Sequence, residues 1–173
     1  MGEINGPEPL GAHHDVSRFD SGAQSLDAWL KSKSRLNEAK GGARTYVVCE
    51  GARVVAFYSL AAGSVERRRV SSRVGRSMPE PIPVILLGQL AVDLDYQGRG
   101  LGGDLIVDAS RRALAAADLI GARALITQAL DERARDFYQR FGFRVFSDRE
   151  PLMLLLRISE LRDVFGGSNP IDE

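Results

Sequence analysis

The sequence predicts one α/β domain, and three observations lead to this fold class. Two runs rich in Val, Tyr and Phe, at 44–50 and 53–63, are separated only by Gly51-Ala52, which is typical of a β-hairpin. The nearly continuous apolar run 83–93 indicates a central strand buried on both faces. A helical pattern follows at 100–117, where apolar residues recur every four positions. A chain of 173 residues has room for one such core.

The remaining elements follow from local patterns. Residues 25–40 predict one amphipathic helix, with Ser25 as N-cap, Leu26, Trp29 and Leu30 on one face, and Gly41 as its stop. Residues 64–82 are rich in Arg and end in prolines, so we expect an exposed, mobile loop. A strand at 122–129, a helix at 131–141 and closing strands at 143–146 and 152–158 complete the chain.

The predicted order is therefore β, β, β, α, β, α, β, β after an N-terminal helical region. We assign residues 1–165 to the single domain and residues 166–173 to a frayed, flexible tail. The N-terminus lacks the basic start and apolar run of a signal peptide, and no stretch approaches the roughly 18 apolar residues of a membrane span. These observations predict a cytoplasmic protein without a membrane partner.

Few residues outside the later motifs could carry chemistry. Cys49 is the one cysteine, and its apolar setting favours a buried structural thiol over a nucleophile. His13 and His14 are the two histidines, and no motif surrounds them. One Cys and two adjacent His do not supply a credible ligand cluster, so the sequence predicts no metal.

Charge is divided unevenly along the chain. The net charge is zero, but residues 31–76 hold eleven Lys or Arg against three acids, which gives this segment a charge of +8 and the remainder −8. Such a basic zone suits binding of a polyanion, since phosphate contacts supply sequence-independent affinity. The alternative is that this segment is an ordinary hydrated surface, which would show the same charge pattern.

A glycine-rich segment, Gln97-Gly98-Arg99-Gly100-Leu101-Gly102-Gly103, lies between the buried strand and the helix that follows it. Glycines allow close backbone approach, and the free N–H groups at a helix start favour phosphate, so this segment is a candidate pyrophosphate site. A plain tight turn is the alternative. A Walker lysine is missing, and the glycines at 98, 100 and 103, although they have the G-x-G-x-x-G spacing, are not followed by the distant acidic residue about 20 positions after the last glycine, which argues against nucleoside triphosphates and dinucleotides.

Two motifs resemble those of the GNAT acetyltransferases. Leu90-Ala91-Val92-Asp93 followed by Tyr96-Gln97-Gly98-Arg99-Gly100-Leu101-Gly102 is similar to motif A of that family, whose Q/R-x-x-G-x-G/A binds the pyrophosphate of acetyl-CoA. The run from Ala134 to Phe143 is similar to motif B, A-x-x-F-Y-x-x-x-G-F. The resemblance implies the GNAT fold, a central mixed and mostly antiparallel sheet flanked by helices, and acetyl-CoA as co-substrate.

The resemblance also implies roles for individual residues. Tyr138 of motif B is the implied general acid, which protonates the leaving thiolate; a core aromatic is the alternative reading of this residue. A protonated Tyr suits such a step, because its pKa is near 10. Asp131 stands where many relatives have Asn, which leaves its pantetheine contact open. The implied acetyl-CoA-binding residues are Leu90, Ala91, Val92, Gln97, Gly98, Arg99, Gly100, Leu101, Gly102, Gly103, Asp131 and Phe137.

A closer resemblance covers nearly the whole chain. The opening Phe19-Asp20-Ser21-Gly22 with Leu26-Asp27 and Trp29-Leu30 is similar to that of the TacT-like toxin acetyltransferases of toxin–antitoxin pairs. This implies acetylation of the α-amino group of aminoacyl-tRNA, a block of translation, and a ribbon-helix-helix antitoxin as partner. A homodimer is a further expectation. The basic zone then offers candidate tRNA-binding residues: Lys31, Lys33, Arg35, Arg67, Arg68, Arg69, Arg73 and Arg76.

Two other functions stay open at this point. One is a GNAT enzyme that acetylates a small amine or a protein N-terminus, which has no need of the +8 zone. The other is a non-catalytic module that binds acetyl-CoA, against which the intact Tyr138 argues.

Overall fold

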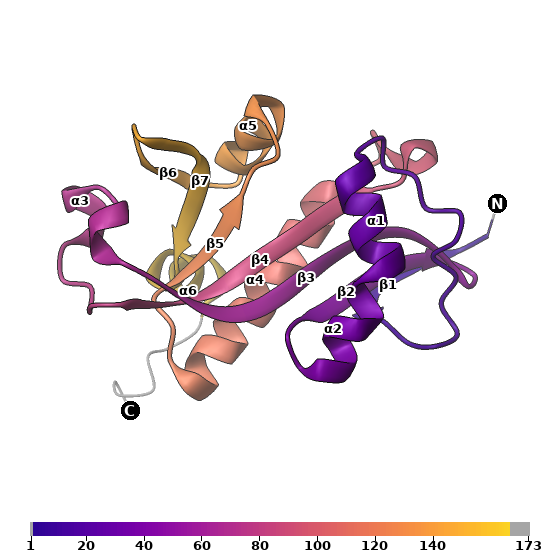
Figure 1. The fold of residues 1–173 in the computed structure, drawn as a ribbon, viewed down its shortest axis with the longest axis horizontal. Helices are drawn as coiled ribbons and strands as arrows, with labels where there is room; N and C mark the ends of the chain where they lie inside the picture. The colour runs from indigo at the N-terminus through magenta and orange to yellow at the C-terminus, as the bar shows by residue number, and fades with distance from the viewer. Residues whose placement is uncertain (1, 167–173) are drawn as a thin grey trace. The chain divides into compact units, whose positions relative to one another are not determined.

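A computed structural model describes residues 2–166 of the chain (Figure 1). The chain contains both helices and strands throughout, as the α/β prediction requires. In order they are β1 (Ile4–Pro9), α1 (Gln24–Ser32), α2 (Ser34–Lys40), β2 (Arg44–Glu50), β3 (Arg53–Val65), the 3-10 turn η1 (Arg67–Arg69), α3 (Ser72–Gly75), β4 (Ile82–Val92), η2 (Leu94–Tyr96), α4 (Leu101–Ile120), β5 (Ala124–Gln128), α5 (Glu132–Arg140), β6 (Arg144–Ser147), β7 (Glu150–Arg157) and α6 (Ile158–Phe165).

The strands form one sheet in the order β1-β2-β3-β4-β5-β7-β6. β4 and β5 pair in parallel, and α4 connects them, as a crossover between parallel strands requires. The pairs β1–β2, β2–β3, β5–β7 and β6–β7 are antiparallel. The predicted mixed and mostly antiparallel sheet is thus confirmed, and so is the hairpin over 44–63.

The chain divides into two compact units, of which the first comprises residues 1–61 and 88–109. In this unit α1 packs onto the β2–β3 hairpin through the predicted stripe of Leu26, Trp29 and Leu30 (Figure 1). Trp29 stacks on Phe57 with ring centroids 6.1 Å apart, and Phe19 meets Phe57 edge-on at 5.3 Å. The aromatic opening of the chain is therefore part of this core.

Three details of the N-terminal region differ from expectation. The single helix over 25–40 is wrong, because the chain breaks between α1 and α2 at Lys33, where the Ser34 hydroxyl donates to the carbonyl of Leu30 at 2.5 Å and competes with the helical ladder. Ser25 is not the N-cap, since α1 begins one residue earlier, after Ala23. Strand β1 was also missed, because its sequence INGPEP shows no alternation and carries the prolines of an edge strand.

The second unit comprises residues 62–87 and, of the described residues, 110–166, and it corrects the prediction of an exposed loop at 64–82. Val65, Val70, Val74, Met78 and Ile82 are buried there, at spacings of four to five residues. They pack in one cluster that also holds residues of β5, β6 and β7. The segment is anchored by these side chains, while its arginines stay on the surface.

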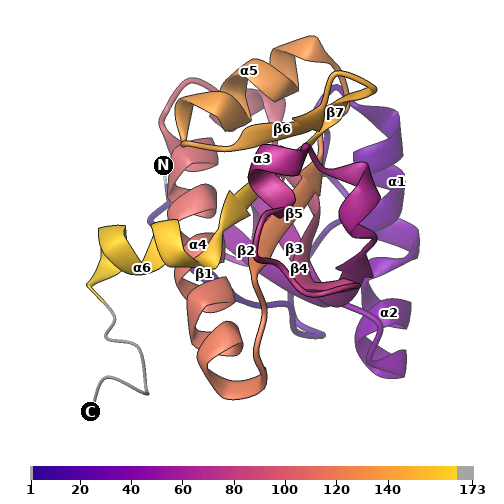
Figure 2. The ribbon, with the colours of Figure 1, turned by 90° about the vertical axis from the view of Figure 1, so that its left-hand side faces the viewer.

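The C-terminal end of the second unit contains a helix that was not predicted. β7 is followed directly by α6, which is amphipathic. Figure 2 shows α5 running beside β6 and β7. Apart from Gly166, the predicted tail lies outside the described residues. Between residues 2 and 166, no helix is long and apolar enough to cross a membrane. The single-domain assignment stays a prediction.

Candidate active site

The predicted phosphate loop lies at the end of β4, where η2 leads into residues 97–100 and then into α4. Gly98 and Gly100 have φ angles of +79° and +84°, a region that glycine occupies without strain. A Cβ added at either residue would have nothing within 4 Å, so no side chain of this loop's unit covers the backbone there. The first N–H groups of α4 lack intrahelical partners and face this exposed turn. The loop therefore fits the pyrophosphate of acetyl-CoA.

Replacing Gly100 with Val is expected to weaken acetyl-CoA binding about ten-fold or more, which corresponds to about 1.4 kcal/mol. The branched side chain would occupy the open space over the loop and strain a positive φ. Calorimetry of the folded variant measures the loss. Gly121→Val is the matched control, because Gly121 also has a positive φ and open surroundings but lies at the other end of α4. Equal affinity for both variants would remove the loop from the acetyl-CoA site.

Asp93, just before this loop, is a buried hydrogen-bonding centre that sequence reasoning missed. Its side chain is 2% exposed, and it accepts the backbone N–H groups of Asp95 and Asp20, both at 3.0 Å. Arg53 Nη2 lies 3.4 Å from Asp93 Oδ1. The carboxylate thus joins β3, η2 and the N-terminal segment, and it fixes where the phosphate loop begins.

The side chain of Gln97 contributes to the same support. Its amide donates to the carbonyls of Val92 at 2.9 Å and Ser21 at 3.1 Å. The side chain of Gln97 is thus bound within the fold, and the contact of residue 97 with phosphate stays a prediction.

Arg99 carries the positive charge of the loop and is held in place by Tyr96. Its guanidinium carbon lies 4.9 Å from the centre of the Tyr96 ring, and its Nη2 donates to the Asp95 carbonyl at 3.0 Å. The Tyr96 hydroxyl donates to Glu50, which raises the pKa of Tyr96 and lowers that of Glu50. Arg99 is thereby positioned at the phosphate loop before any ligand arrives.

The residues predicted to line the pantetheine arm lie in β4, immediately before the loop. Ala91 is buried, and Leu90 and Val92 are half-buried. Together with residues 97–103 they form one continuous stretch within the first unit. The backbone pairing of 90–92 with pantetheine stays a prediction.

Tyr138 lies in α5 of the second unit, with its side chain almost wholly buried at 6% exposure. Burial raises the pKa of its phenol, and a hydrogen bond to Thr127 partly opposes this shift. Thr127 in turn donates to the carbonyl of Leu87 at 3.0 Å. The hydroxyl is therefore protonated at neutral pH and held at the β4–β5 pair, as a general acid requires. Thr127 is a second residue that sequence reasoning missed.

Asp131 and Phe137, which are predicted to contact acetyl-CoA beside Tyr138, have different surroundings in the structure. Asp131 is the N-cap of α5, and its carboxylate accepts the Ala134 N–H at 2.8 Å. This gives Asp131 a structural role that does not depend on pantetheine. Phe137 is half-buried, and its ring lies 5.4 Å from that of Tyr138. Their contacts with acetyl-CoA stay predictions.

Comparison with known proteins agrees with this geometry. Residues 41–145 match the family model described as "Acetyltransferase (GNAT) domain". The chain belongs to the GNAT acetyltransferase family. It is an acetyl-CoA-dependent N-acetyltransferase, and the resemblance inferred from motifs A and B is confirmed.

Relatives of this GNAT acetyltransferase include toxins. It is 45% identical over 166 residues to the tRNA-acetylating toxin of Mycobacterium tuberculosis (strain ATCC 25618 / H37Rv), covering 96% of this chain and 99% of the toxin. AtaT complexed with acetyl-methionyl-tRNAfMet is 27% identical, with a TM-score of 0.84 over 94% of this chain and 98% of AtaT. A Tyr-to-Phe variant of AtaT bound to the C-terminus of the antitoxin AtaR is 26% identical, with a TM-score of 0.80 over 95% and 98%.

The basic residues that are predicted from the sequence to bind tRNA are of two kinds. Three guanidinium groups are bound within the fold: Arg35 donates to the His14 carbonyl at 2.6 Å, Arg69 Nη2 lies 2.8 Å from Glu150, and Arg68 pairs with Glu66. The others are not tied to a carboxylate in residues 2–166; they are Lys31, Lys33, Arg67, Arg73 and Arg76. Their binding of tRNA stays a prediction.

The remaining reactive groups of the acetyltransferase have structural surroundings. Burial raises the pKa of the Cys49 thiol to about 11, so it is not a thiolate at neutral pH. Glu8, His13 and His14 bring their ligand atoms within 4.8 Å of one another, which the sequence did not predict. Both ring nitrogens of His14 are engaged, however, one by the Gly11 N–H at 2.8 Å and one by Glu8 at 2.9 Å. The absence of a metal requirement stays a prediction.

Proposed function

We propose that this enzyme transfers the acetyl group of acetyl-CoA to the α-amino group of aminoacyl-tRNA and thereby stops translation. The observation that carries the proposal is a buried, protonated Tyr138 in a chain 45% identical to a tRNA-acetylating toxin. The basic residues without a carboxylate partner, with Arg73 and Arg76 among them, support a polyanionic substrate over a small amine.

The residues of the chain divide the chemistry between them. Acetyl-CoA supplies the activated acetyl thioester. An α-amino group has a reference pKa of about 8, so an appreciable fraction is neutral near pH 7 and attacks without a strong general base. The nitrogen bonds to the acetyl carbon and the C–S bond breaks. Tyr138 donates its phenolic proton to the departing sulfur, the nitrogen releases its surplus proton to water, and the hydrogen bond to Thr127 fixes the position of the Tyr138 oxygen.

The decisive experiment incubates the purified protein with labelled acetyl-CoA and charged tRNA. We expect the label on the α-amino group of the aminoacyl moiety, and growth arrest when the protein is expressed alone. Deacylated tRNA, small amines and N-terminal peptides are the controls. Label on amines or peptides, but never on aminoacyl-tRNA, would show instead that the protein acetylates small amines or protein N-termini.

An antitoxin partner follows from the same proposal. AtaT, a structural neighbour, is solved with the antitoxin AtaR, and the antitoxin expected here is of the ribbon-helix-helix class. A homodimer remains a further expectation. Light scattering of the protein, alone and mixed with the antitoxin, tests the antitoxin complex and the homodimer. A protein that is monomeric and does not bind the antitoxin would contradict both expectations.

A further inference from the structure

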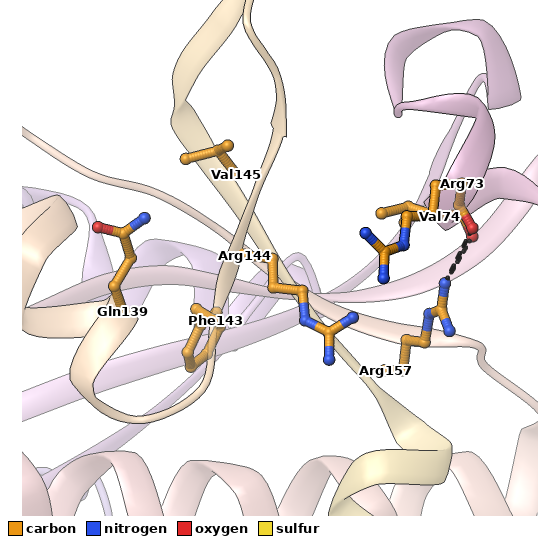
Figure 3. Close-up of a pocket in the computed structure, with 7 residues that line it drawn as sticks. All are labelled: Arg73, Val74, Gln139, Phe143, Arg144, Val145 and Arg157. Carbon is orange, nitrogen blue, oxygen red and sulfur yellow. Dashed lines mark hydrogen bonds between the residues drawn. The ribbon is translucent and has the colours of Figure 1, made fainter.

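The second unit contains a pocket of about 770 Å³ that the assigned residues do not explain (Figure 3). Three arginines from three elements line it: Arg73 from α3, Arg144 from β6 and Arg157 from the end of β7. Figure 3 shows their guanidinium groups around the same space, with Gln139 and Phe143 on the opposite side. Only Arg73 was assigned to the substrate from the sequence.

The pocket holds more positive than negative charge. Arg157 Nη2 donates to the backbone carbonyls of Arg73 at 3.3 Å and Val74 at 3.2 Å, which orient the guanidinium but leave its charge unopposed. Arg144 Nη2 lies 2.6 Å from Glu160. Arg73 is exposed and has no ion pair with any residue that the structure describes. Within residues 2–166, only one of the three arginines, Arg144, is thus paired with a carboxylate.

The chemistry of the lining favours phosphate as the bound group. A guanidinium offers a planar fork of donors that matches two oxygens of one phosphate, and several forks around one space select for it. The apolar side chains of Val74 and Val145 and the amide of Gln139 line the rest of the pocket, which suits a ribose or base attached to that phosphate.

The pocket is also close to the proposed acid. Gln139 follows Tyr138 in α5, and the ring of Phe143 packs on that of Tyr138 with centroids 5.4 Å apart. In an aminoacyl-tRNA the amino acid is esterified to the terminal ribose, so the first phosphodiesters lie a few bonds from the reacting amine. A substrate whose amine reaches Tyr138 therefore has phosphates within reach of this pocket.

We propose that Arg73, Arg144 and Arg157 form a phosphate-binding cleft for the acceptor end of the tRNA substrate. This inference rests on the proposed function and adds Arg144 and Arg157 to the substrate contacts. An acidic polypeptide is the other class of anion that arginines accept, and the experiment below distinguishes it.

The test uses the full chain with Arg73→Gln and Arg144→Gln combined. We expect a higher KM for aminoacyl-tRNA, and a slope of log affinity against log salt that falls by about 1.4–1.8 if two phosphate contacts are lost. Acetyl-CoA affinity and turnover at saturating tRNA should stay at wild-type values. Arg73→Lys with Arg144→Lys keeps the charge and should keep the salt slope. Arg18→Gln with Arg149→Gln removes the same charge from exposed positions outside the cleft and should change neither value.

Thermal unfolding shows whether each variant is folded. If the glutamine pair is not, Arg73→Gln alone repeats the test, because Arg73 is exposed and has no ion pair within residues 2–166; the salt slope should then fall by about 0.7–0.9. A wild-type salt slope and KM in the glutamine pair would overturn the cleft, while aminoacyl-tRNA acetylation by the wild type would keep the proposed function. Lost affinity for poly-glutamate with unchanged affinity for tRNA would also overturn it. If the wild type never acetylates aminoacyl-tRNA, the proposed function itself fails.

Discussion

Tyr138→Phe is expected to lower turnover by about 10²–10⁴-fold, the usual contribution of a positioned acid. The substitution removes one hydroxyl from a side chain that is 6% exposed, and the ring keeps its packing against Phe137 and Phe143. Fold and acetyl-CoA affinity should therefore change little. Single-turnover kinetics with labelled acetyl-CoA measure the chemical step directly.

Two further variants separate acid catalysis from packing. Thr127→Val keeps the shape of the side chain but removes the hydrogen bond to the Tyr138 hydroxyl, so we expect an intermediate loss of turnover. Tyr46→Phe removes a phenol from β2, outside the residues assigned to the reaction, and should turn over like the wild type. Wild-type turnover in the Tyr138→Phe enzyme would show that Tyr138 is not the general acid.

Asp93→Ala is expected to destabilise the protein by about 3–5 kcal/mol, the usual cost of removing one partner of a buried ion pair. The change leaves Arg53 without its buried carboxylate and two backbone N–H groups, of Asp20 and Asp95, without an acceptor. Urea unfolding gives the difference in the free energy of unfolding. Acetyl-CoA affinity should fall as well, because the phosphate loop begins at this residue.

The neighbouring Asp95→Ala is the matched control. Asp95 also pairs with Arg53, at 3.2 Å, but its side chain is 75% exposed. An exposed pair contributes about 0–1 kcal/mol, so we expect a small loss of stability. Similar losses for both variants would show that burial of Asp93 is not what stabilises the loop.

Much of the fold could be predicted because its signals are local. The hairpin at 44–63, the buried strand β4 and helix α4 each carry their own periodicity, and the structure has all three. The break at Lys33 could not be predicted in this way, because it depends on a Ser34 side chain that bonds to the backbone. The buried valines of 64–82 were overlooked since their arginine neighbours dominate the composition.

In the candidate site, too, the residues with local sequence signals were predicted and those that depend on distant contacts were not. Motif spacing pointed to the phosphate loop and to Tyr138, and the structure places both where a strand or helix supports them. The supporting residues were missed because their partners are distant in the sequence: Asp93 binds a residue 73 positions away, and Thr127 binds one 40 positions away. Arg144 and Arg157 carry no motif, and only the fold brings them to Arg73.

The stacking of Arg99 on Tyr96 has an entropic consequence. A long side chain that is immobilised when a ligand binds loses rotamer freedom, which costs about 0.5–1.5 kcal/mol of affinity. Arg99 loses this freedom when the chain folds, because the Tyr96 ring and the Asp95 carbonyl already hold its guanidinium. The conformational entropy of Arg99 is thus subtracted from the stability of the fold and not from the affinity for the phosphate that residues 97–103 are predicted to bind.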